Sequence, residues 1–246
     1  MERKAIYIAK RNTSIPLEAW PNAWLSHHET ARQFPQLMAT CASFQFYDRV
    51  LRPRLAGAAF NPPGVVGDDD GVDGVCIMEG AADAPPISPK DAARIFPLIR
   101  KDELRCFDRK DRDFVFKVEE TLAVGKASLD VGVFRFLVRR PSTSHEAFLR
   151  HWNGAYAEAA QRALKTVSYV GGYRQNTVTV AQPPHYPFDG ISELWFSSLE
   201  DATRSFLERD LAPLSQDLTA FCDMTKSITV LTQLLLKRRP ATDYEY

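Results

Sequence analysis

The sequence has no excess of charge, few cysteines and no long apolar stretch, and each shortage excludes a class of protein. It contains 31 basic and 31 acidic side chains among 246 residues, whereas a nucleic-acid-binding domain normally carries a basic excess. No apolar run approaches the roughly 18–20 residues of a membrane-spanning helix. The charged start at residues 1–4 is not followed by the apolar core of a secretory signal. We therefore expect a cytoplasmic protein that binds neither nucleic acid nor membrane.

The side chains that usually hold metals are also poorly arranged. The four cysteines form no Cys-x-x-Cys pair and no metal-ligand spacing, so we interpret them as reduced, mostly buried thiols. His27 and His28 are adjacent on a predicted helix, where successive side chains point about 100° apart and do not converge. The acidic run 68–70 lacks the spacing of a calcium loop. The sequence therefore predicts no metal and no other cofactor.

What the sequence does contain is an order of landmarks that occurs twice. Strand-like runs at residues 4–10 and 131–138 are each followed by a polar turn and an amphipathic helix, in which Trp24 and Trp152 occupy the same place. The later matches pair Phe46-Tyr47 with Gly172-Tyr173, Asp70-Gly71 with Asp189-Gly190, Ser88-Pro89-Lys90-Asp91 with Ser198-Leu199-Glu200-Asp201, and Phe107-Asp108 with Cys222-Asp223. The two serines are typical helix N-caps. The order indicates one structural unit present twice.

Each half has the order strand, helix, strand, strand, helix, strand, which is that of the ferredoxin-like unit. The sheet of one unit has an apolar face that a second sheet can cover. We therefore predict the α+β class, with tandem ferredoxin-like βαββαβ repeats at residues 1–125 and 126–246. The repeats are expected to pack sheet-to-sheet as an intramolecular α/β barrel, joined by the short segment 122–130.

Two passages depart from this pattern. Pro21 falls inside the first helical segment, which predicts either a kink or a helix that begins near Trp20. Residues 53–67 are rich in proline and glycine and have no counterpart of that length in the second half. We expect them to form a long surface loop.

With these landmarks, both halves resemble the EthD family. The family pattern is a helix with F-x-x-x-W-x-x-x-H, an aspartate–glycine pair before a strand of the type E-L-W-F, and F-x-D before the last strand. The second half supplies Phe148, Trp152, Asp189-Gly190, Glu193-Leu194-Trp195-Phe196 and Phe221-Cys222-Asp223, and the first half supplies Trp20, Trp24, His28, Asp70-Gly71 and Cys106-Phe107-Asp108. The resemblance implies a dimeric α/β-barrel fold. It also implies a likeness to cofactor-free dehydratases, cyclases or decarboxylases of polyketide or aromatic compounds.

The first helix of each half is the best place for a catalytic group. Trp20, Trp24 and His28 recur every four residues, so they share one helical stripe that faces the interior. Histidine has an unperturbed pKa of about 6.5, and burial lowers it and favours the neutral form that can act as a base. We predict that His28 is catalytic; a structural histidine bonded to the backbone is the alternative.

Two further residues complete the predicted catalytic set. Tyr156 stands in the second half where His28 stands in the first, and a phenol there can donate a hydrogen bond to a developing oxyanion. The alternative is a space-filling tyrosine with one hydrogen-bond partner. Asp108 precedes the last strand of the first half, where its carboxylate can orient His28 or bond the backbone of its own turn.

Aromatic side chains supply the predicted substrate pocket. The chain is 11% aromatic, enough to line a cavity for a flat hydrophobic ligand. The predicted substrate-binding residues, which are alternatively core residues, are Trp24, Trp152, Tyr47, Tyr173 and Trp195.

Residues and resemblance together predict a cofactor-independent lyase or isomerase that acts on a small hydrophobic, aromatic or polyketide-like compound. A pocket histidine serves as its proton shuttle. One alternative is a non-catalytic binding or accessory protein of a degradation or biosynthesis pathway. Another is a haem-linked oxygenase with His28 or His185 as the axial ligand. Because one chain can complete the barrel, a monomer is sufficient, and a homodimer stays open.

Overall fold

The computed structural model of the chain describes residues 4–50, 54–55, 58–59, 72–108, 115–182, 186–207 and 211–238. The first half contains the strands β1 (Lys4–Ala9), β2 (Cys41–Arg49), β3 (Arg54–Leu55), β4 (Ala58–Ala59), β5 (Gly74–Gly80) and β6 (Val115–Gly125). Its helices are η1 (Leu17–Ala19), α1 (Trp20–Arg32), α2 (Pro35–Met38) and α3 (Pro89–Cys106). The second half contains the strands β7 (Val131–Leu137), β8 (Gly172–Gln182), β9 (Gly190–Phe196) and β10 (Ile228–Arg238). Its helices are α4 (His145–His151), η2 (Trp152–Tyr156), α5 (Ala157–Leu164), α6 (Leu199–Leu207) and α7 (Ala212–Phe221).

Strands from both halves close a single antiparallel barrel in the order β1-β5-β2-β10-β7-β9-β8-β6. Within it, the orders β6-β1-β5-β2 and β10-β7-β9-β8 place the fourth, first, third and second barrel strands of each half side by side. The two sheets meet edge to edge, where β2 pairs with β10 and β6 pairs with β8. The predicted α+β barrel within one chain is therefore confirmed. The division into two repeats at 1–125 and 126–246 stays a prediction.

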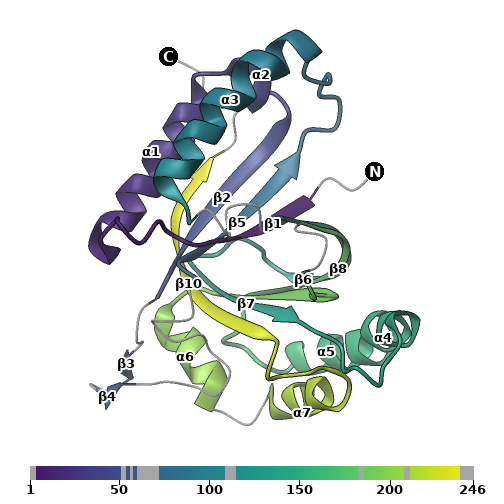
Figure 1. The fold of residues 1–246 in the computed structure, drawn as a ribbon. Coiled ribbons are helices and arrows are strands. Elements are labelled where there is room, and N and C mark those ends of the chain that lie inside the picture. Colours follow the sequence, from purple (N-terminus) through teal and green to yellow (C-terminus); the bar gives the residue numbers. More distant parts are fainter. Residues whose placement is uncertain are drawn as a thin grey trace.

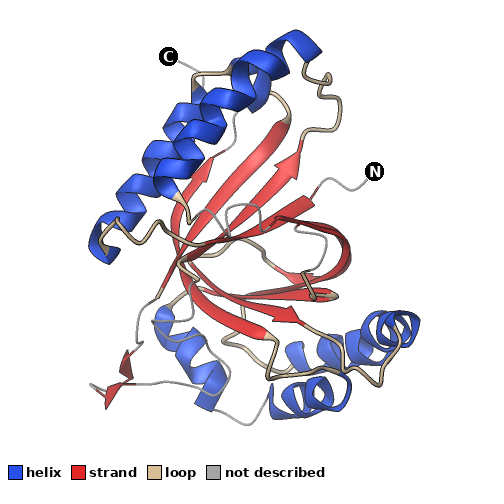
Figure 2. Ribbon diagram, in the orientation of Figure 1, coloured by secondary structure: helices blue, strands red, loops and turns tan. Residues whose placement is uncertain are grey.

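Helices cover two opposite outer faces of the barrel (Figure 1). α1 and α3 lie against the first-half sheet, and α4 to α7 lie against the second-half sheet. Figure 2 shows the strands between these two groups of helices. Successive side chains of a strand point to opposite faces, so Phe134 and Phe136 of β7 enter the barrel while Val133 and Leu137 face the helices.

The core accordingly has three parts. The N-terminal layer lies between α1, α3 and the first-half sheet and contains Trp20, Trp24, Phe44, Phe46, Cys76 and Phe107. The barrel interior contains Ile6, Ile8, Tyr47, Phe116, Phe134, Phe136 and Trp195. The C-terminal layer lies between α4 to α7 and the second-half sheet and contains Phe148, Trp152, Tyr156, Tyr173, Leu194 and Leu231.

The predicted helix starts are confirmed. Ser88 accepts a hydrogen bond from the Asp91 N–H at 3.0 Å at the start of α3, and Ser198 accepts one from the Asp201 N–H at 3.1 Å at the start of α6. α1 begins at Trp20, so Pro21 lies in its first turn, where the N–H that proline lacks has no intrahelical partner to lose. Of the two readings of Pro21, the structure selects a helix start.

The match between the aspartate–glycine pairs was wrong by three residues. The structural counterpart of Asp189-Gly190 is Asp73-Gly74. The Asp73 N–H donates to the Ala9 carbonyl at 2.8 Å and the Asp189 N–H donates to the Leu137 carbonyl at 2.8 Å. Each carboxylate also accepts the backbone N–H of an arginine at 2.9 Å, Arg11 in the first half and Arg139 in the second. The sequence reads Asp-Gly-Val-Asp-Gly-Val at 70–75, so the sequence pattern alone could not choose between the two copies.

The match between the second strands was wrong by the same amount. Asp48 pairs with Gly74, and Thr177 pairs with the equivalent Gly190. Tyr47 therefore corresponds to Asn176, and Tyr173 corresponds to Phe44. Because a shift by an odd number of residues exchanges the two faces of a strand, Tyr47 and Tyr173 lie on opposite sides of the barrel wall.

Several expectations lie partly or wholly outside the described residues. These are the acidic run 68–70, most of the expected loop at 53–67, and His185. Within that loop segment the structure describes the paired strands β3 and β4. Among the helices that the structure describes, none is both long and apolar enough to cross a membrane.

Candidate functional site

The structure distributes the predicted site residues over three places. Trp24 and His28 lie on α1 at the N-terminal layer, and Tyr47 and Trp195 lie in the barrel interior. The C-terminal layer holds Trp152, Tyr156 and Tyr173. Because the barrel wall separates these places, one ligand cannot contact all five predicted pocket aromatics.

Trp24 and Trp152 are equivalent anchors of the two layers. Each indole lies on the glycine that opens the third barrel strand of its half. A Cβ added at Gly74 would stand 2.4 Å from the Trp24 ring, and one added at Gly190 would stand 3.1 Å from the Trp152 ring. Both tryptophans are fully buried. This packing accounts for the repeated spacing of Trp and Asp-Gly along the sequence.

His28 is a buried imidazole among phenylalanine rings. Its side chain is 3% exposed, and the Phe44 and Phe46 ring centroids lie 5.1 and 4.9 Å from its own. Its Nε2 atom is buried, and among the described residues it has no hydrogen-bond partner. Burial, reinforced by the Arg238 charge, lowers the pKa of His28 to about 4. At neutral pH the imidazole is therefore uncharged.

A carboxylate that the sequence analysis did not single out lies next to a histidine of α1. Asp102 of α3 lies 2.8 Å from Nδ1 of His27, the neighbour of His28. Burial opposes its ionisation, but hydrogen bonds from Arg105 and His27 keep the pKa of Asp102 below its ordinary value. The Asp108 backbone N–H donates to the Lys10 carbonyl at 3.0 Å. The roles predicted for His28 and Asp108 as a pair stay a prediction.

Sequence reasoning missed this histidine–aspartate contact and a similar one in the second half. In the second half Nε2 of His151 lies 3.0 Å from Asp217 of α7. The His27 and His151 rings also contact Phe107 and Phe221, at 5.2 and 4.4 Å between centroids. Asp102 and Asp217 stand at the same separation before the matched Asp108 and Asp223, and that separation was the available signal. The first pair joins α1 to α3, and the second joins α4 to α7.

Tyr156 belongs to a helical turn that has no counterpart among the described residues of the first half. Residues Trp152–Tyr156 form a π-helical turn, a feature that inserts one extra residue and is frequent at functional sites. Gln175 Nε2 donates to the Trp152 carbonyl at 2.8 Å, and the Tyr173 hydroxyl donates to Gln175 Oε1 at 3.1 Å. Burial raises the pKa of Tyr156 to about 12, although the nearby Arg135 charge and Tyr173 hydroxyl oppose the rise. The phenol therefore stays protonated and able to donate.

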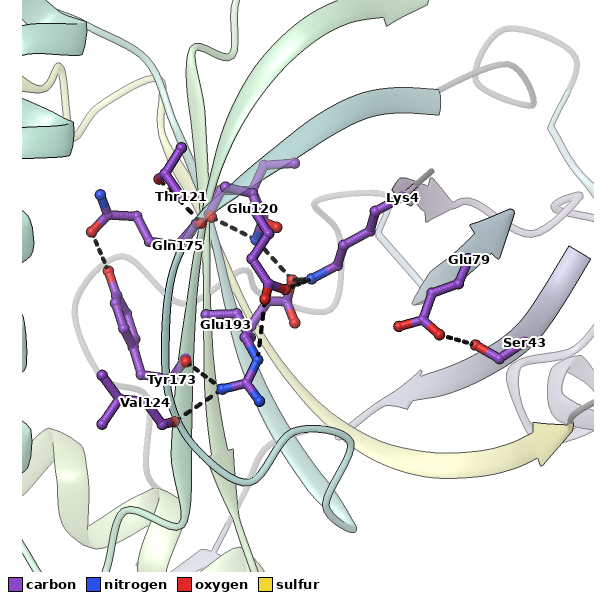
Figure 3. Close-up of polar contacts among 12 residues, drawn as sticks. Lys4, Ser43, Glu79, Glu120, Thr121, Val124, Tyr173, Gln175 and Glu193 are labelled. Carbon is purple, nitrogen blue, oxygen red and sulfur yellow. Dashed lines mark hydrogen bonds and ion pairs between the residues drawn. The ribbon is translucent and has the colours of Figure 1, made fainter. Parts of the chain in front are cut away.

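The barrel interior combines aromatic packing with one buried charge cluster. The Tyr47 ring lies 5.1 Å from the Trp195 ring, and both are fully buried. Lys4 Nζ lies 2.6 Å from Oε1 of Glu193 and 2.9 Å from Oε2 of Glu120 (Figure 3). Glu193 is 1% exposed. Since Lys4 is on β1 and Glu193 on β9, this ion pair links the two halves across the barrel.

The ligands for a bound metal do not gather. In the part of the chain that the structure describes, no group of three or more histidine, cysteine or acidic side chains could hold a metal ion. The four cysteines are unpaired, and Cys76, Cys106 and Cys222 are buried. Burial raises the pKa of the Cys106 and Cys222 thiols to about 12, which suppresses the reactive thiolate.

Comparisons with known proteins found a family match and similar solved structures. A family model, the EthD domain, matches residues 140–225, and no curated protein matches. An anthrone oxidase-like protein has a similar structure, with a TM-score of 0.55 and 11% identity over 98% of this chain and 94% of that one. A "putative monooxygenase" from Lactobacillus acidophilus NCFM also has a similar structure, with a TM-score of 0.53 and 9% identity over 97% of both chains. A protein of the same description from Fusobacterium nucleatum subsp. nucleatum has a TM-score of 0.52 and 6% identity over 96% of this chain and 93% of that one.

At these identities the likeness to solved structures shows the fold alone. That fold extends over nearly the whole chain in all three comparisons. The EthD match, by contrast, lies within the second half and includes α4 to α7, β8 and β9. The predicted resemblance to the EthD family is therefore confirmed for residues 140–225, and for the first half it stays a prediction.

Proposed function

We propose that this chain is a cofactor-independent enzyme of the lyase or isomerase type that acts on a small hydrophobic, aromatic or polyketide-like compound. His28 supplies the proton-transfer group. The observation that carries this proposal is the buried Nε2 atom of a neutral imidazole in the N-terminal layer, which has no hydrogen-bond partner among the described residues. The proposal also takes the two halves to be diverged copies of one EthD-like repeat.

A buried polar atom without a partner costs about 1–3 kcal/mol of stability. Folds retain such atoms where function uses them, as in catalytic groups. The rings of Phe44 and Phe46 flank the imidazole, so a ligand that reaches Nε2 meets an apolar surround. This environment favours a flat, hydrophobic molecule with one polar atom at the reacting position.

A neutral imidazole can perform the proton transfers of this reaction class without a metal. It accepts a proton from a carbon next to a carbonyl, and the electron pair of the broken C–H bond moves to the carbonyl oxygen as an enolate. The imidazolium then returns the proton to a second carbon in an isomerisation. In a dehydration it protonates a leaving hydroxyl, which departs as water.

A specific observation also supports a non-catalytic binding protein. A general base works best when its pKa lies near the working pH, and the pKa of His28 is about 4. In that second reading the uncharged imidazole only hydrogen-bonds a ligand that the protein holds or delivers. No comparable observation favours the haem-linked oxygenase.

The test replaces His28 and its neighbour separately. His28→Ala and His28→Gln are assayed for dehydration, cyclisation and decarboxylation of aromatic β-hydroxy and β-keto compounds. We expect turnover to fall about 10²–10⁴-fold. His27→Gln removes an imidazole from the adjacent position and is the matched control, which should keep turnover. Full activity in both His28 variants would remove His28 from the mechanism, and ligand binding without turnover in the wild type would favour the binding protein.

A further inference from the structure

A row of polar side chains crosses the helix-facing side of the second-half sheet. Strand pairing aligns Thr229 with Arg135, Arg135 with Ser192, and Ser192 with Gln175. These positions alternate with barrel-facing residues and lie on the same face as Leu194 and Leu231 of the C-terminal layer. The row is therefore directed into an otherwise apolar layer beneath the helices.

The same row in the first-half sheet is apolar or aromatic. There the paired residues are Val115, Tyr7, Cys76 and Phe46. In this row Tyr7 corresponds to Arg135, and its hydroxyl accepts the hydrogen bond of the Trp24 Nε1–H at 3.0 Å. The N-terminal layer thus satisfies its central indole from within.

In the C-terminal layer that hydrogen bond is missing. Trp152 is the counterpart of Trp24, but the strand position equivalent to Tyr7 carries Arg135, which is a donor and cannot accept. Trp152 Nε1 is buried without a partner, and so is Ser192 Oγ, although both residues are 1% exposed or less. Two buried donors therefore lack an acceptor, counted over the residues that the structure describes.

Arg135 adds a positive charge to these donors. It is half-buried, and within the described ranges its side chain has no ion pair and no hydrogen bond, whereas the nearby Arg139 pairs with Asp189. Its charge acts on the hydroxyls of Tyr156 and Tyr173, so it lies within electrostatic reach of the π-helical turn. A partly buried guanidinium without a carboxylate leaves its fork of donors available.

The geometry points to a binding site for a small aromatic carboxylate in the C-terminal layer. Arg135 pairs with the carboxylate, and Trp152 Nε1 and Ser192 Oγ donate the remaining hydrogen bonds. A planar carboxylate matches the guanidinium fork and offers enough lone pairs for all three donors. One positive charge in apolar surroundings favours a monoanion on a hydrophobic body over a phosphate dianion. This site stands whether or not His28 takes part in a reaction.

The π-helical turn gives the site its shape. It carries Trp152 at its first position and Tyr156 at its last, and Gln175, the end of the polar row, holds its free carbonyl. Gly154 lies in the middle of the turn, and a Cβ added there would meet no atom within 4 Å. The turn therefore has room on its outer side to adjust when a ligand enters beneath it.

The test measures binding of 2-naphthoate and of its neutral analogue 2-naphthylmethanol by titration calorimetry. We expect saturable binding of the acid by the wild-type chain, and at least tenfold weaker binding of the alcohol. Arg135→Met keeps the apolar stem, removes the charge and should weaken acid binding at least tenfold. Arg135→Lys keeps the charge without the fork and should lie between. Arg162→Met removes an exposed charge from the same half and should leave binding unchanged.

A second measurement is made on the wild-type chain, so that the proposal can still be tested if the Arg135 variants do not fold. The indole N–H resonance of Trp152, assigned with Trp152→Phe, should shift when 2-naphthoate binds, because that N–H gains an acceptor. The proposal is overturned if the wild type does not bind the acid at millimolar concentration, if the alcohol binds equally well, if Arg135→Met keeps full affinity, or if the indole resonance does not move. His28→Ala must bind the acid normally, since the two layers are separate; a failure of the His28 proposal alone leaves this result intact.

Discussion

In the N-terminal layer the indole of Trp24 donates to Tyr7, while in the C-terminal layer the equivalent indole of Trp152 has no acceptor among the described residues. The strand backbone beside them is alike in both places, although Trp24 lies in an α-helix and Trp152 begins a π-helical turn. Asp73 and Asp189 receive matching hydrogen bonds, and each tryptophan lies on a glycine. Arg135 stands where the first half has Tyr7, and Ser192 stands where it has Cys76. The C-terminal layer therefore has donors for which the described residues supply no acceptor. Two layers with the same strand arrangement can thus keep one fold while their side chains acquire different chemistry.

The helix stripe differs in the same way. His28 is neutral and lies among phenylalanine rings, whereas Tyr156 belongs to a π-helical turn and lies near a positive charge. The N-terminal layer therefore offers one uncharged proton acceptor, and the C-terminal layer offers several donors. We therefore propose different tasks for the two layers, proton transfer in one and anion binding in the other.

The largest expected effect tests how tightly each frame is packed. Gly74→Ala would place a methyl group 2.4 Å from the Trp24 ring and 2.9 Å from the Tyr47 carbonyl. We expect a loss of about 3 kcal/mol in the free energy of unfolding. Gly190→Ala meets the Trp152 ring only at 3.1 Å and should cost about 1 kcal/mol. Urea unfolding measures both, and equal losses would mean that the two layers are packed alike.

The next effect is a pH dependence that belongs to the N-terminal layer. The pKa of His28 is about 4 in the folded chain and about 6.5 in the unfolded chain. Between these values the unfolded chain binds a proton that the folded chain does not, so stability decreases as pH falls. From pH 6.5 to pH 5 the loss due to His28 should be about 2 kcal/mol.

His28→Phe should lack this part of the loss, and the difference between variant and wild type isolates it. Tyr156→Phe should show the wild-type profile over the same range, because the Tyr156 hydroxyl titrates only near pH 12. Thermal or urea unfolding at each pH supplies the measurement. Parallel curves for the wild type and His28→Phe would show that His28 is not held neutral by the fold.

The smallest effect exchanges the residues that distinguish the layers. Arg135→Tyr puts a phenol at the strand position equivalent to Tyr7, the acceptor of the Trp24 indole, and should raise the free energy of unfolding by about 1 kcal/mol. Tyr7→Phe removes the acceptor of Trp24 and should lower it by about 1–2 kcal/mol. If Arg135→Tyr instead destabilises the chain as much as Tyr7→Phe does, the residue at position 135 does not decide whether the Trp152 indole has a partner.

The repeated landmarks were enough to predict the fold. Each half has one set of strands and helices in the ferredoxin-like order, and Ser88 and Ser198 mark helix starts because N-capping is a local interaction. The stripe of Trp20, Trp24 and His28 follows from helical periodicity alone. Burial of His28, and hence its neutral state, follows from the apolar company of that stripe.

The site was harder to predict, because strand partners far apart in the chain decide it. Tyr47 and Tyr173 look alike in sequence, but pairing with β5 and β9 sends one into the barrel and the other under the helices. Arg135 was not among the predicted site residues, because a lone arginine in a strand pattern does not indicate which face of the sheet it occupies. The polar row exists only because four strands align their registers.

The order and type of the elements, and the inward stripe of each first helix, were properties of the sequence by itself, because helix periodicity and capping act between residues a few positions apart. Which side chains meet across the sheets was decided by the tertiary structure. Strand register is set by contacts between distant segments, and a shift of one residue moves a side chain to the other face. For that reason the Trp152 indole and the Arg135 side chain, which have no partner among the residues that the structure describes, can be recognised only once the barrel has closed.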